Sequence, residues 1–304
     1  MSSVNSVFLL LGSVIAAGFV LRKSGVVGES DYKIYFKLIT TLIIPCLILS
    51  NFRTVELTPE YLSIFAVSCL FGMFLSALVY VLLPGKTRSQ KGMAVLNFAG
   101  INVGFIGIPL AEALFGPEAT PIMVAVHGGN AVTLYAFCVI HAQLYTEQGA
   151  DWRAAGRRLA TSPVLLALAA ALLMAATGIH LPDFCYTFTD TITKINTPLS
   201  MLALGMTLDF NLGADERRLV FKMLPLRYLA GGLAAFALCA LNLYPPLTRY
   251  TLVLFFLLPG AINCIAYCSE YDFHPKAAAL FNSLSNVITF VLVWAVFGFL
   301  LPPL

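Results

Sequence analysis

Residues 97–109 read NFAGINVGFIGIP, an apolar stretch with three glycines, two asparagines and a proline in thirteen residues. These residue types are poor helix formers in any solvent. An opened helix in a bilayer exposes backbone N–H and C=O groups, so it survives only inside protein or beside a water-filled cavity. We therefore predict a broken membrane helix, with Gly100, Gly107 and Pro109 as helix-breaking residues. The alternative is that the glycines only permit tight packing between helices.

A similar breaker lies later in the chain, where residues 259–263 read PGAIN. Pro259 and Gly260 are the helix-breaking residues of this second stretch. Two interrupted hydrophobic segments at corresponding places in the two halves of a chain are the best sequence indication of a transporter binding site. Half-helices that end near the middle of the membrane present positive N-terminal ends to an anion and carbonyl oxygens to a cation.

The composition requires a bilayer around most of the chain. Of the 304 residues, 59% are hydrophobic and only 11% are charged, whereas soluble domains carry about 25% charged residues. A spanning helix needs about 20 mainly apolar residues, and segments 4–21 and 61–83 meet this length without a charged residue. We therefore predict an all-α integral membrane protein with no soluble domain.

Charged residues and Pro/Gly breaks divide the chain into ten predicted transmembrane segments. These are residues 4–21, 34–51, 61–83, 92–115, 120–145, 162–179, 188–208, 219–243, 250–271 and 276–301. The two breakers fall in the fourth and ninth segments, which are the corresponding members of two groups of five.

The lysines and arginines select the orientation of these segments, because basic residues concentrate at cytoplasmic loops. With the N-terminus outside, only Arg53, Lys194 and Arg249 of the 18 basic residues remain outside. All others, Arg227 among them, are then assigned to cytoplasmic ends. We predict that both termini are extracytoplasmic and that the chain lies in the cytoplasmic (inner) membrane.

The ten segments form two halves of five, residues 1–151 and 152–304. Because five is odd, a duplicated half would be inverted in the membrane, as in many secondary transporters. Residues 99–103 (AGINV) resemble residues 260–264 (GAINC), which places Asn102 and Asn263 at corresponding positions. The sequence thus predicts two inverted five-helix repeats.

Amide and imidazole side chains near the two breakers are the candidate substrate contacts. The Asn102 and Asn263 amides each offer donors and an acceptor, and His127 and Asn130 lie three residues apart, so they share a helix face. The sequence places no basic residue at the middle of the membrane, so the helix ends themselves are expected to attract a small organic anion. The complete predicted substrate-binding set is Asn102, Asn263, Gly104, Ile101, Ile262, His127, Asn130 and Asn282. The alternative for the asparagines is that they only hydrogen-bond helices to one another.

Several motifs resemble the auxin efflux carrier family, and the resemblance covers nearly the whole chain in order. Residues 102–110 (NVGFIGIPL) and 113–118 (ALFGPE) are similar to the family's fourth-helix motif, the most specific of them. Residues 129–135 (GNAVTLY), 198–208 and 266–275 resemble parts of its fifth, seventh and ninth helices.

This resemblance implies a fold and a function. The implied fold has ten helices in two inverted five-helix repeats, with the fourth and ninth helices broken and crossing. The family includes plant auxin exporters and bacterial permeases proposed for malate or malonate. The implied function is therefore secondary transport of a small organic anion, a carboxylate such as an auxin-like acid or a dicarboxylate. His127 is similar in position to a glutamine of plant members that belongs to a site supporting transport. Plant members carry prolines where this chain has Ile101 and Asn263, which is a departure from the auxin-carrying pattern.

Other protein classes fit less well. An intramembrane enzyme needs a catalytic constellation, and the four histidines lie in separate segments; a channel needs a repeated pore motif. A bile-acid-type sodium symporter or sodium/proton antiporter of similar crossed-helix fold stays open as the alternative. We expect no enzyme activity, no metal, no cofactor and no nucleic-acid partner. The expected partners are the anion, the lipid bilayer and a coupling ion, proton or sodium, with a homodimer left open.

Overall fold

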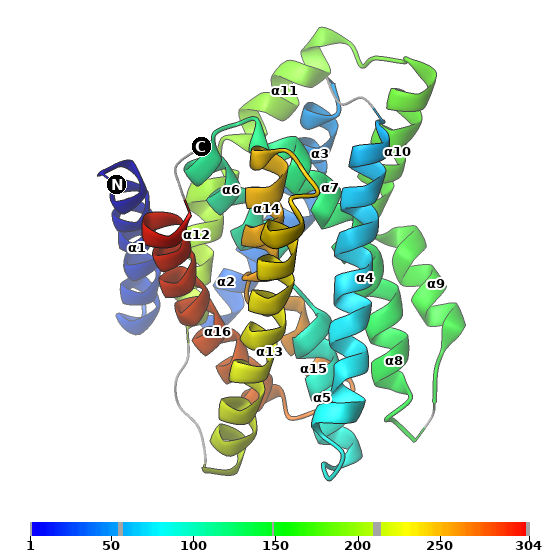
Figure 1. Cartoon of the computed structure of the whole chain (residues 1–304), viewed down its shortest axis with the longest axis vertical. Helices are drawn as coiled ribbons and strands as arrows, with labels where there is room; N and C mark the ends of the chain where they lie inside the picture. Colours follow the sequence, from blue (N-terminus) through cyan, green and yellow to red (C-terminus); the bar gives the residue numbers. More distant parts are fainter. Residues whose placement is uncertain (1, 54–56, 148, 209–213, 302–304) are drawn as a thin grey trace.

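The computed structural model describes residues 2–53, 57–147, 149–208 and 214–301. Every regular element within these ranges is a helix, which confirms the predicted all-α class. Figure 1 shows a bundle of roughly parallel helices in which the first helix begins and the last one ends at the same end of the molecule. The extreme ends of the chain, residues 1 and 302–304, lie outside the described part, so only this common placement bears on the predicted orientation.

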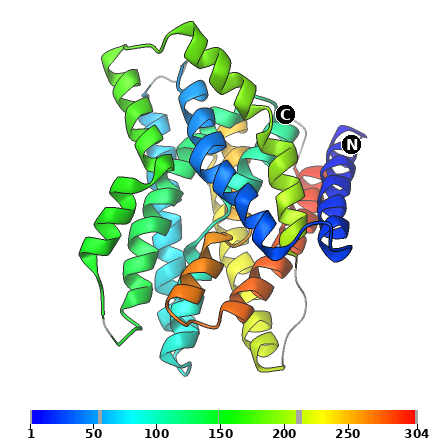
Figure 2. The same cartoon turned by 180° about the vertical axis from the view of Figure 1, so that it is seen from behind.

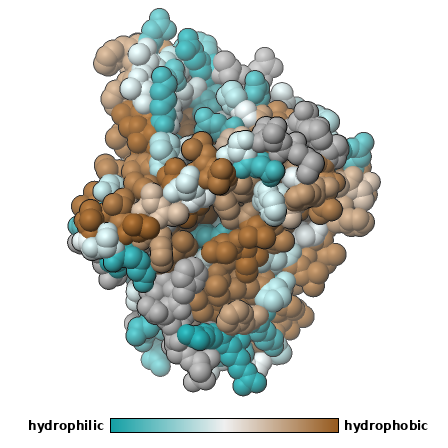
Figure 3. Space-filling model, turned by 90° about the vertical axis from the view of Figure 1, so that its left-hand side faces the viewer, coloured by the Kyte–Doolittle hydropathy of each residue, from teal (hydrophilic) through white to brown (hydrophobic). Residues whose placement is uncertain are grey.

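In the described part of the chain, six helical stretches are long and apolar enough to cross a membrane by themselves. They are Val4–Lys23, Lys33–Asn51, Pro59–Leu82, Ala119–Gln143, Arg217–Leu241 and Pro275–Leu300. Each coincides with a predicted segment: the first, second, third, fifth, eighth and tenth. On the face drawn in Figure 3, hydrophobic residues cover much of the middle and hydrophilic residues gather mainly toward the two ends, the distribution expected of a surface that lipid tails surround.

These six stretches are built from α-helices and three short π-helical segments. In chain order they are α1 (Ser2–Lys23), α2 (Glu29–Leu38), η1 (Ile39–Ile43), α3 (Ile44–Asn51), α4 (Pro59–Leu82), α7 (Ala119–Val132), η3 (Thr133–Cys138), α8 (Val139–Gln143), α13 (Ala214–Leu241), α16 (Pro275–Ala295) and η4 (Val296–Leu300). Because a π-helical turn holds an extra residue, it shifts the face that the following residues present.

The other four predicted segments contain shorter helices. They are α5 (Arg88–Ala99), η2 (Val103–Gly107) and α6 (Ile108–Phe115) in the fourth; α10 (Pro163–Thr177) in the sixth; α11 (Asp183–Thr193) and α12 (Asn196–Thr207) in the seventh; and α14 (Pro246–Phe256) and α15 (Asn263–Glu270) in the ninth. A further helix, α9 (Trp152–Thr161), precedes the sixth segment and was not predicted from the sequence. α9 and α10 meet at a bend of 61°. The predicted interruptions of the fourth and ninth segments are therefore present, while the count of ten crossings stays a prediction.

The seventh segment was predicted as one helix over 188–208, and the structure divides it. α11 ends at Thr193 and α12 begins at Asn196. The cause is Pro198, which has no N–H and crowds the preceding turn, so it is tolerated only near the start of a helix. The sequence does not predict the separate helix α11 that precedes this proline.

α12 lies between α1 and the α2–η1–α3 segment, as the view from behind in Figure 2 shows. Glycines allow α1 and α12 to touch backbone to backbone. A Cβ atom added to Gly18 would lie 2.1 Å from the Leu202 carbonyl oxygen, and one added to Gly205 would lie 1.9 Å from the Ile15 carbonyl oxygen. Small residues at such contacts are the usual basis of tight helix packing in membranes.

We expect Gly18→Ala to lower the thermal stability of the purified protein, since forced overpacking destabilises by about 1–3 kcal/mol. Gly12→Ala on the same helix is the matched control, because its added Cβ would meet Phe290 at an ordinary 3.6 Å and alanine favours a helix. Thermal unfolding of the two variants in the same detergent measures the difference. Equal melting temperatures would show that α1 and α12 do not pack this closely.

Candidate functional site

The fourth segment opens between α5 and η2. α5 ends at Ala99, and Gly100 has extended backbone angles (φ −71°, ψ 116°) before η2 begins at Val103. Asn102 closes the new helix end, because its Oδ1 accepts a hydrogen bond from the Phe105 N–H at 3.3 Å. The break is therefore a defined turn of the chain with its own capping side chain.

The ninth segment opens between α14 and α15, where residues 257–262 are not helical. Side chains of neighbouring helices satisfy the backbone that this opening frees. Thr289 on α16 donates to the Leu257 carbonyl at 2.7 Å, and Ser285 accepts from the Gly260 N–H at 3.2 Å. Freed backbone groups inside a membrane require such partners, so the break is held by the surrounding bundle.

The two breaks cross and pair through their backbones. Residues 100–102 and 259–261 form an antiparallel bridge centred on Ile101 and Gly260. Its hydrogen bonds run from Asn102 N to Pro259 O and from Ala261 N to Gly100 O, each 3.0 Å long. We call this arrangement the crossing.

The crossing has local two-fold symmetry, and its register corrects one prediction. Asn102 and Ala261 are the equivalent donors, so the counterpart of Asn102 is Ala261. By the same register the counterpart of Asn263 is Gly104, which lies two residues after the predicted counterpart, Asn102. The prediction paired Asn102 with Asn263 because the residues around them are similar. The backbone hydrogen bonds of the crossing instead pair Asn102 with Ala261.

Two further asparagines satisfy the carbonyls at the centre of the crossing. Asn130 on α7 donates to the Ile101 carbonyl at 2.8 Å, and Asn282 on α16 donates to the Gly260 carbonyl at 2.7 Å. The helices that carry them follow the fourth and the ninth segment, so the two bonds are related by the same local symmetry. A buried carbonyl left unpaired costs about 1–3 kcal/mol, so both asparagines stabilise the crossing.

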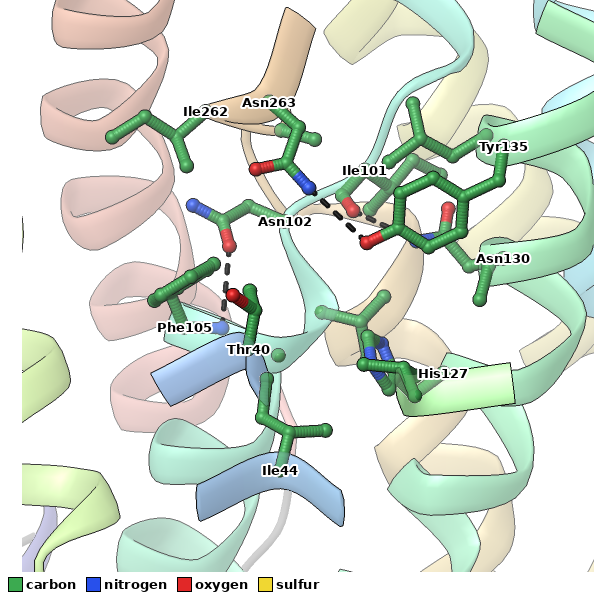
Figure 4. Close-up of a pocket in the computed structure, with 16 residues that line it drawn as sticks. Thr40, Ile44, Ile101, Asn102, Phe105, His127, Asn130, Tyr135, Ile262 and Asn263 are labelled. Atoms are coloured by element: carbon green, nitrogen blue, oxygen red, sulfur yellow. Dashed lines mark hydrogen bonds between the residues drawn. The ribbon is translucent and has the colours of Figure 1, made fainter. Parts of the chain in front are cut away.

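A cavity of about 20 Å³ lies beside the crossing (Figure 4), enough for about one water molecule. We call it the crossing cavity. It is lined by Thr40, Ile44, Ile101, Asn102, Val103, Gly104, Phe105, His127, Asn130, Ala131, Leu134, Tyr135, Val164, Ala261, Ile262 and Asn263. Seven of the eight predicted contact residues thus come together here. Asn282 does not line the cavity and lies behind Gly260 instead.

Polar atoms at the crossing cavity are buried without a hydrogen-bond partner in the described part of the chain. They are Nδ2 of Asn102, Oδ1 of Asn130 and both ring nitrogens of His127. Figure 4 shows His127 beside Asn130 and facing the space below the crossing. None of the lining residues is an aspartate or a glutamate. The cavity therefore offers amide and imidazole groups, without a carboxylate, to whatever enters it.

Gly104 brings the η2 backbone close to this histidine. A Cβ atom at Gly104 would lie 2.6 Å from Cδ1 of Ile44 and 3.3 Å from Cε1 of His127. Any larger residue would therefore push apart the walls of the cavity.

The two remaining residues that were predicted to break the helix, Gly107 and Pro109, lie outside the cavity lining. A Cβ atom on Gly107 would meet Leu258 Cδ1 at 2.6 Å, so this glycine allows η2 to pack on the ninth-segment break. The prediction that Gly107 and Pro109 break the helix is wrong, because Val103–Phe115 is one continuous helix that runs through both residues. Pro109 lies directly after the π-helical segment η2, which accommodates a locally altered hydrogen-bond pattern.

Sequence reasoning missed Tyr135, whose hydroxyl accepts a hydrogen bond from Asn263 Nδ2 at 3.2 Å. Tyr135 follows Asn130 by five residues and lies in η3. In a regular α-helix that spacing separates two side chains, whereas a π-helical turn returns the fifth residue to the same face. A search at the α-helical period therefore does not find it.

The second missed residue is Arg227, which the sequence assigned to a cytoplasmic helix end. The structure buries it, with 1% of its surface exposed, and its Nη2 donates to the Leu258 carbonyl at 2.7 Å. No carboxylate pairs with it among the described residues, and its Nε has no partner there either. A basic residue thus lies at the depth of the ninth-segment break, contrary to the expectation of none at mid-membrane.

Comparisons with known proteins agree with a transporter. A family model described as "Membrane transport protein" matches residues 3–152 and 152–298. The chain is 25% identical over 214 residues to a protein of Methanothermobacter thermautotrophicus (strain Delta H) described as an uncharacterized transporter. That alignment covers 69% of each chain.

The family matches cover nearly all of the described residues, and they point to a membrane transporter rather than an enzyme. The six long apolar helices are those of an integral membrane protein. The chain therefore belongs to this family of membrane transport proteins, the auxin efflux carrier family.

Proposed function

We propose that this protein is a secondary transporter that moves a small organic anion across the cytoplasmic membrane by alternating access. The substrate site is the crossing cavity. The observation that carries the proposal is the crossing itself, with unpaired polar atoms of Asn102, Asn130 and His127 buried beside it. Broken helices and unsatisfied polar groups are costly at membrane depth, so a transport site accounts for their presence.

Three sources of positive potential favour an anion as the substrate. η2 and α15 both begin at the cavity, and a helix N-terminus carries about half a positive charge. Arg227 adds a full charge at the ninth-segment break, where its guanidinium donates to the Leu258 carbonyl. The Nδ2 group of Asn102 is a free donor for a carboxylate oxygen.

The volume of the cavity supports a cycle in which the site opens and closes. At about 20 Å³ it is too small for any carboxylate of several heavy atoms, so the site is closed to such a substrate in this conformation. Substrate entry then requires α15, or the η2 side, to move. Alternating access in transporters of this kind is a rocking of one repeat against the other around a fixed site.

The proposed architecture is ten transmembrane segments in two inverted repeats, residues 1–151 and 152–304, with both termini extracytoplasmic. Two observations support it. The bonds of Asn130 and Asn282 to the crossing are related by a local two-fold axis, and the first described helix begins and the last one ends at the same end of the bundle.

A sodium symporter or a sodium/proton antiporter is not favoured. The described lining of the crossing cavity has no carboxylate, and hard cations prefer oxygen ligands that include carboxylates. If transport is coupled to protons, His127 is the titratable lining residue best placed to carry one. A homodimer also stays a proposal.

Competition between acids and their neutral amides tests the proposed substrate class. Purified protein is first screened with small carboxylates by thermal shift, since a ligand that binds the native state raises its stability. Uptake of the best ligand into proteoliposomes should then be inhibited by its unlabelled acid and by related carboxylates. The matched amides should inhibit at least about tenfold less, because they lack the charge-assisted hydrogen bonds, worth about 1.5–3 kcal/mol each. Inhibition by the amides as strong as by the acids would contradict an anion site.

A further inference from the structure

A second and larger cavity, of about 700 Å³, opens near the end of the bundle opposite the termini. It is bounded by the end of α8, the start of α9 and the end of α15. Its lining includes Gln143, Asp151, Trp152, Arg158, Glu270 and Tyr271. Small-molecule sites measure about 300–1,000 Å³, so this cavity, unlike the crossing cavity, has room for an organic anion.

α15 connects the two cavities. Asn263 at its start lines the crossing cavity, and Glu270 at its end lines the larger one, a distance of about 10 Å along a helix. Asn263, Tyr267 and Tyr271 are four residues apart, so they follow one face of this path. A residue that contacts this face of α15 therefore lies along the path between the two cavities.

Arg158 of α9 contacts this face of α15. The Arg158 guanidinium lies 5.1 Å from the ring centre of Tyr267 and 5.9 Å from that of Tyr271, and its Nη2 pairs with the Glu270 carboxylate. Cation–π contacts at these distances are attractive. One arginine thus joins α9 to the lower half of α15.

The ion pair is placed where an entering anion can exchange with it. The Glu270 side chain is 47% exposed and that of Arg158 is 26% exposed, and partly exposed pairs contribute little to stability. The guanidinium binds carboxylates in a planar fork, and its Nη1 has no hydrogen-bond partner among the described residues. The Tyr271 hydroxyl accepts from Gln143 at 3.1 Å and keeps its own proton to donate.

We propose that the larger cavity is an anion-binding vestibule in which a substrate carboxylate replaces Glu270 on Arg158 and binds the Tyr271 hydroxyl before it reaches the crossing. This inference rests on the proposed transport function and adds a separate site to it. Exchange of one carboxylate for another keeps the charge of the guanidinium balanced. It also removes the direct ion pair between α9 and Glu270, which is one of the contacts that hold the end of α15 against α9.

Tryptophan fluorescence can report this site directly. The chain has two tryptophans, and Trp152 lines the vestibule, whereas Trp294 lies beside Asn5, to which it donates a hydrogen bond at 2.8 Å. In a Trp294→Phe background the emission comes from Trp152 alone. We expect titration with malonate, malate or phenylacetate to change this emission saturably for at least one of the three acids.

Variants of three residues decide whether Arg158 is the ligand. Arg158→Gln should weaken the response at least tenfold, whereas Arg157→Gln, which removes the same charge from an exposed neighbour, should leave it unchanged. Glu270→Gln removes the competing carboxylate and should tighten binding several-fold. The opposite signs for Arg158 and Glu270 distinguish exchange from a general loss of folding, which circular dichroism of each variant checks.

Two results would overturn the vestibule. One is the lack of a saturable response to all three acids, and the other is an equal loss in Arg157→Gln and Arg158→Gln. The test is independent of the crossing, since Asn102→Leu should lower transport by about 10–100-fold and leave the Trp152 titration intact. If Asn102→Leu transports normally and the Trp152 titration is also retained, the crossing is not the substrate site, but the vestibule still binds the anion.

Discussion

Asn102→Leu should lower transport by about 10–100-fold while the substrate-free protein keeps nearly all of its stability. The Asn102 amide is 2% exposed and lines the crossing cavity, and its Nδ2 has no partner in the described structure. The only described bond that its side chain makes is the 3.3 Å bond accepted from Phe105 N. A hydrogen bond to a charged ligand is worth about 1.5–3 kcal/mol, about a factor of 10–100 in binding.

Asn130→Leu is the comparison that distinguishes a residue that binds substrate from one that stabilises the crossing. It breaks the 2.8 Å bond to the Ile101 carbonyl and leaves that buried acceptor unpaired, so it should lower apo stability by about 1–3 kcal/mol as well as transport. Proteoliposome uptake and thermal unfolding of both variants provide the measurements. If Asn102→Leu loses as much apo stability as Asn130→Leu, Asn102 is a structural residue of the crossing. Wild-type transport in Asn102→Leu removes it from the site.

Arg227→Met should lower transport of the anion by about tenfold or more without a large loss of stability. Charges that interact in partly buried surroundings contribute about 2 kcal/mol, about a factor of 30 in affinity. The substitution has two opposing effects on folding. It leaves the Leu258 carbonyl unpaired, which destabilises the protein. It also removes a buried charge that has no described carboxylate partner, which stabilises the protein.

Lys222→Met on the same helix is the control for Arg227→Met, because it removes a charge from an exposed position. It should transport normally. Arg227→Lys keeps the charge but loses the planar donor fork, so partial activity is expected. The readouts are uptake at several substrate concentrations and thermal unfolding. If Arg227→Met transports as well as Lys222→Met, the buried charge does not act on the substrate.

The sequence predicted the breaks near Gly100 and Gly260 because glycine, asparagine and proline disfavour a helix, but the same rule wrongly extended the first break to Gly107 and Pro109, which lie in the helix Val103–Phe115. Five of the predicted cavity residues follow from the same reasoning because they adjoin the breakers, namely Ile101, Asn102, Gly104, Ile262 and Asn263. His127 and Asn130 were predicted for another reason, since they are polar residues that share one face of the fifth segment. The sequence did not predict the register of the crossing. The similar residues around Asn102 and Asn263 suggested that these two correspond, whereas the backbone hydrogen bonds pair Asn102 with Ala261.

Arg227 and Tyr135 were missed for different physical reasons. Counting charges assigns a basic residue to the nearest loop, but α13 begins at Ala214, so Arg227 lies more than three turns inside the helix. Tyr135 reaches Asn263 through a π-helical segment, and hydrophobic periodicity does not reveal where such segments occur. Both residues depend on helix contacts between distant parts of the chain.

The most direct test of the crossing as the substrate site is a cryo-electron microscopy map of the protein with the best carboxylate from the thermal-shift screen bound. We expect ligand density in an enlarged crossing cavity, with a carboxylate oxygen within hydrogen-bond distance of Asn102 Nδ2. Density confined to another part of the bundle, with the crossing still closed at its present volume, would contradict it.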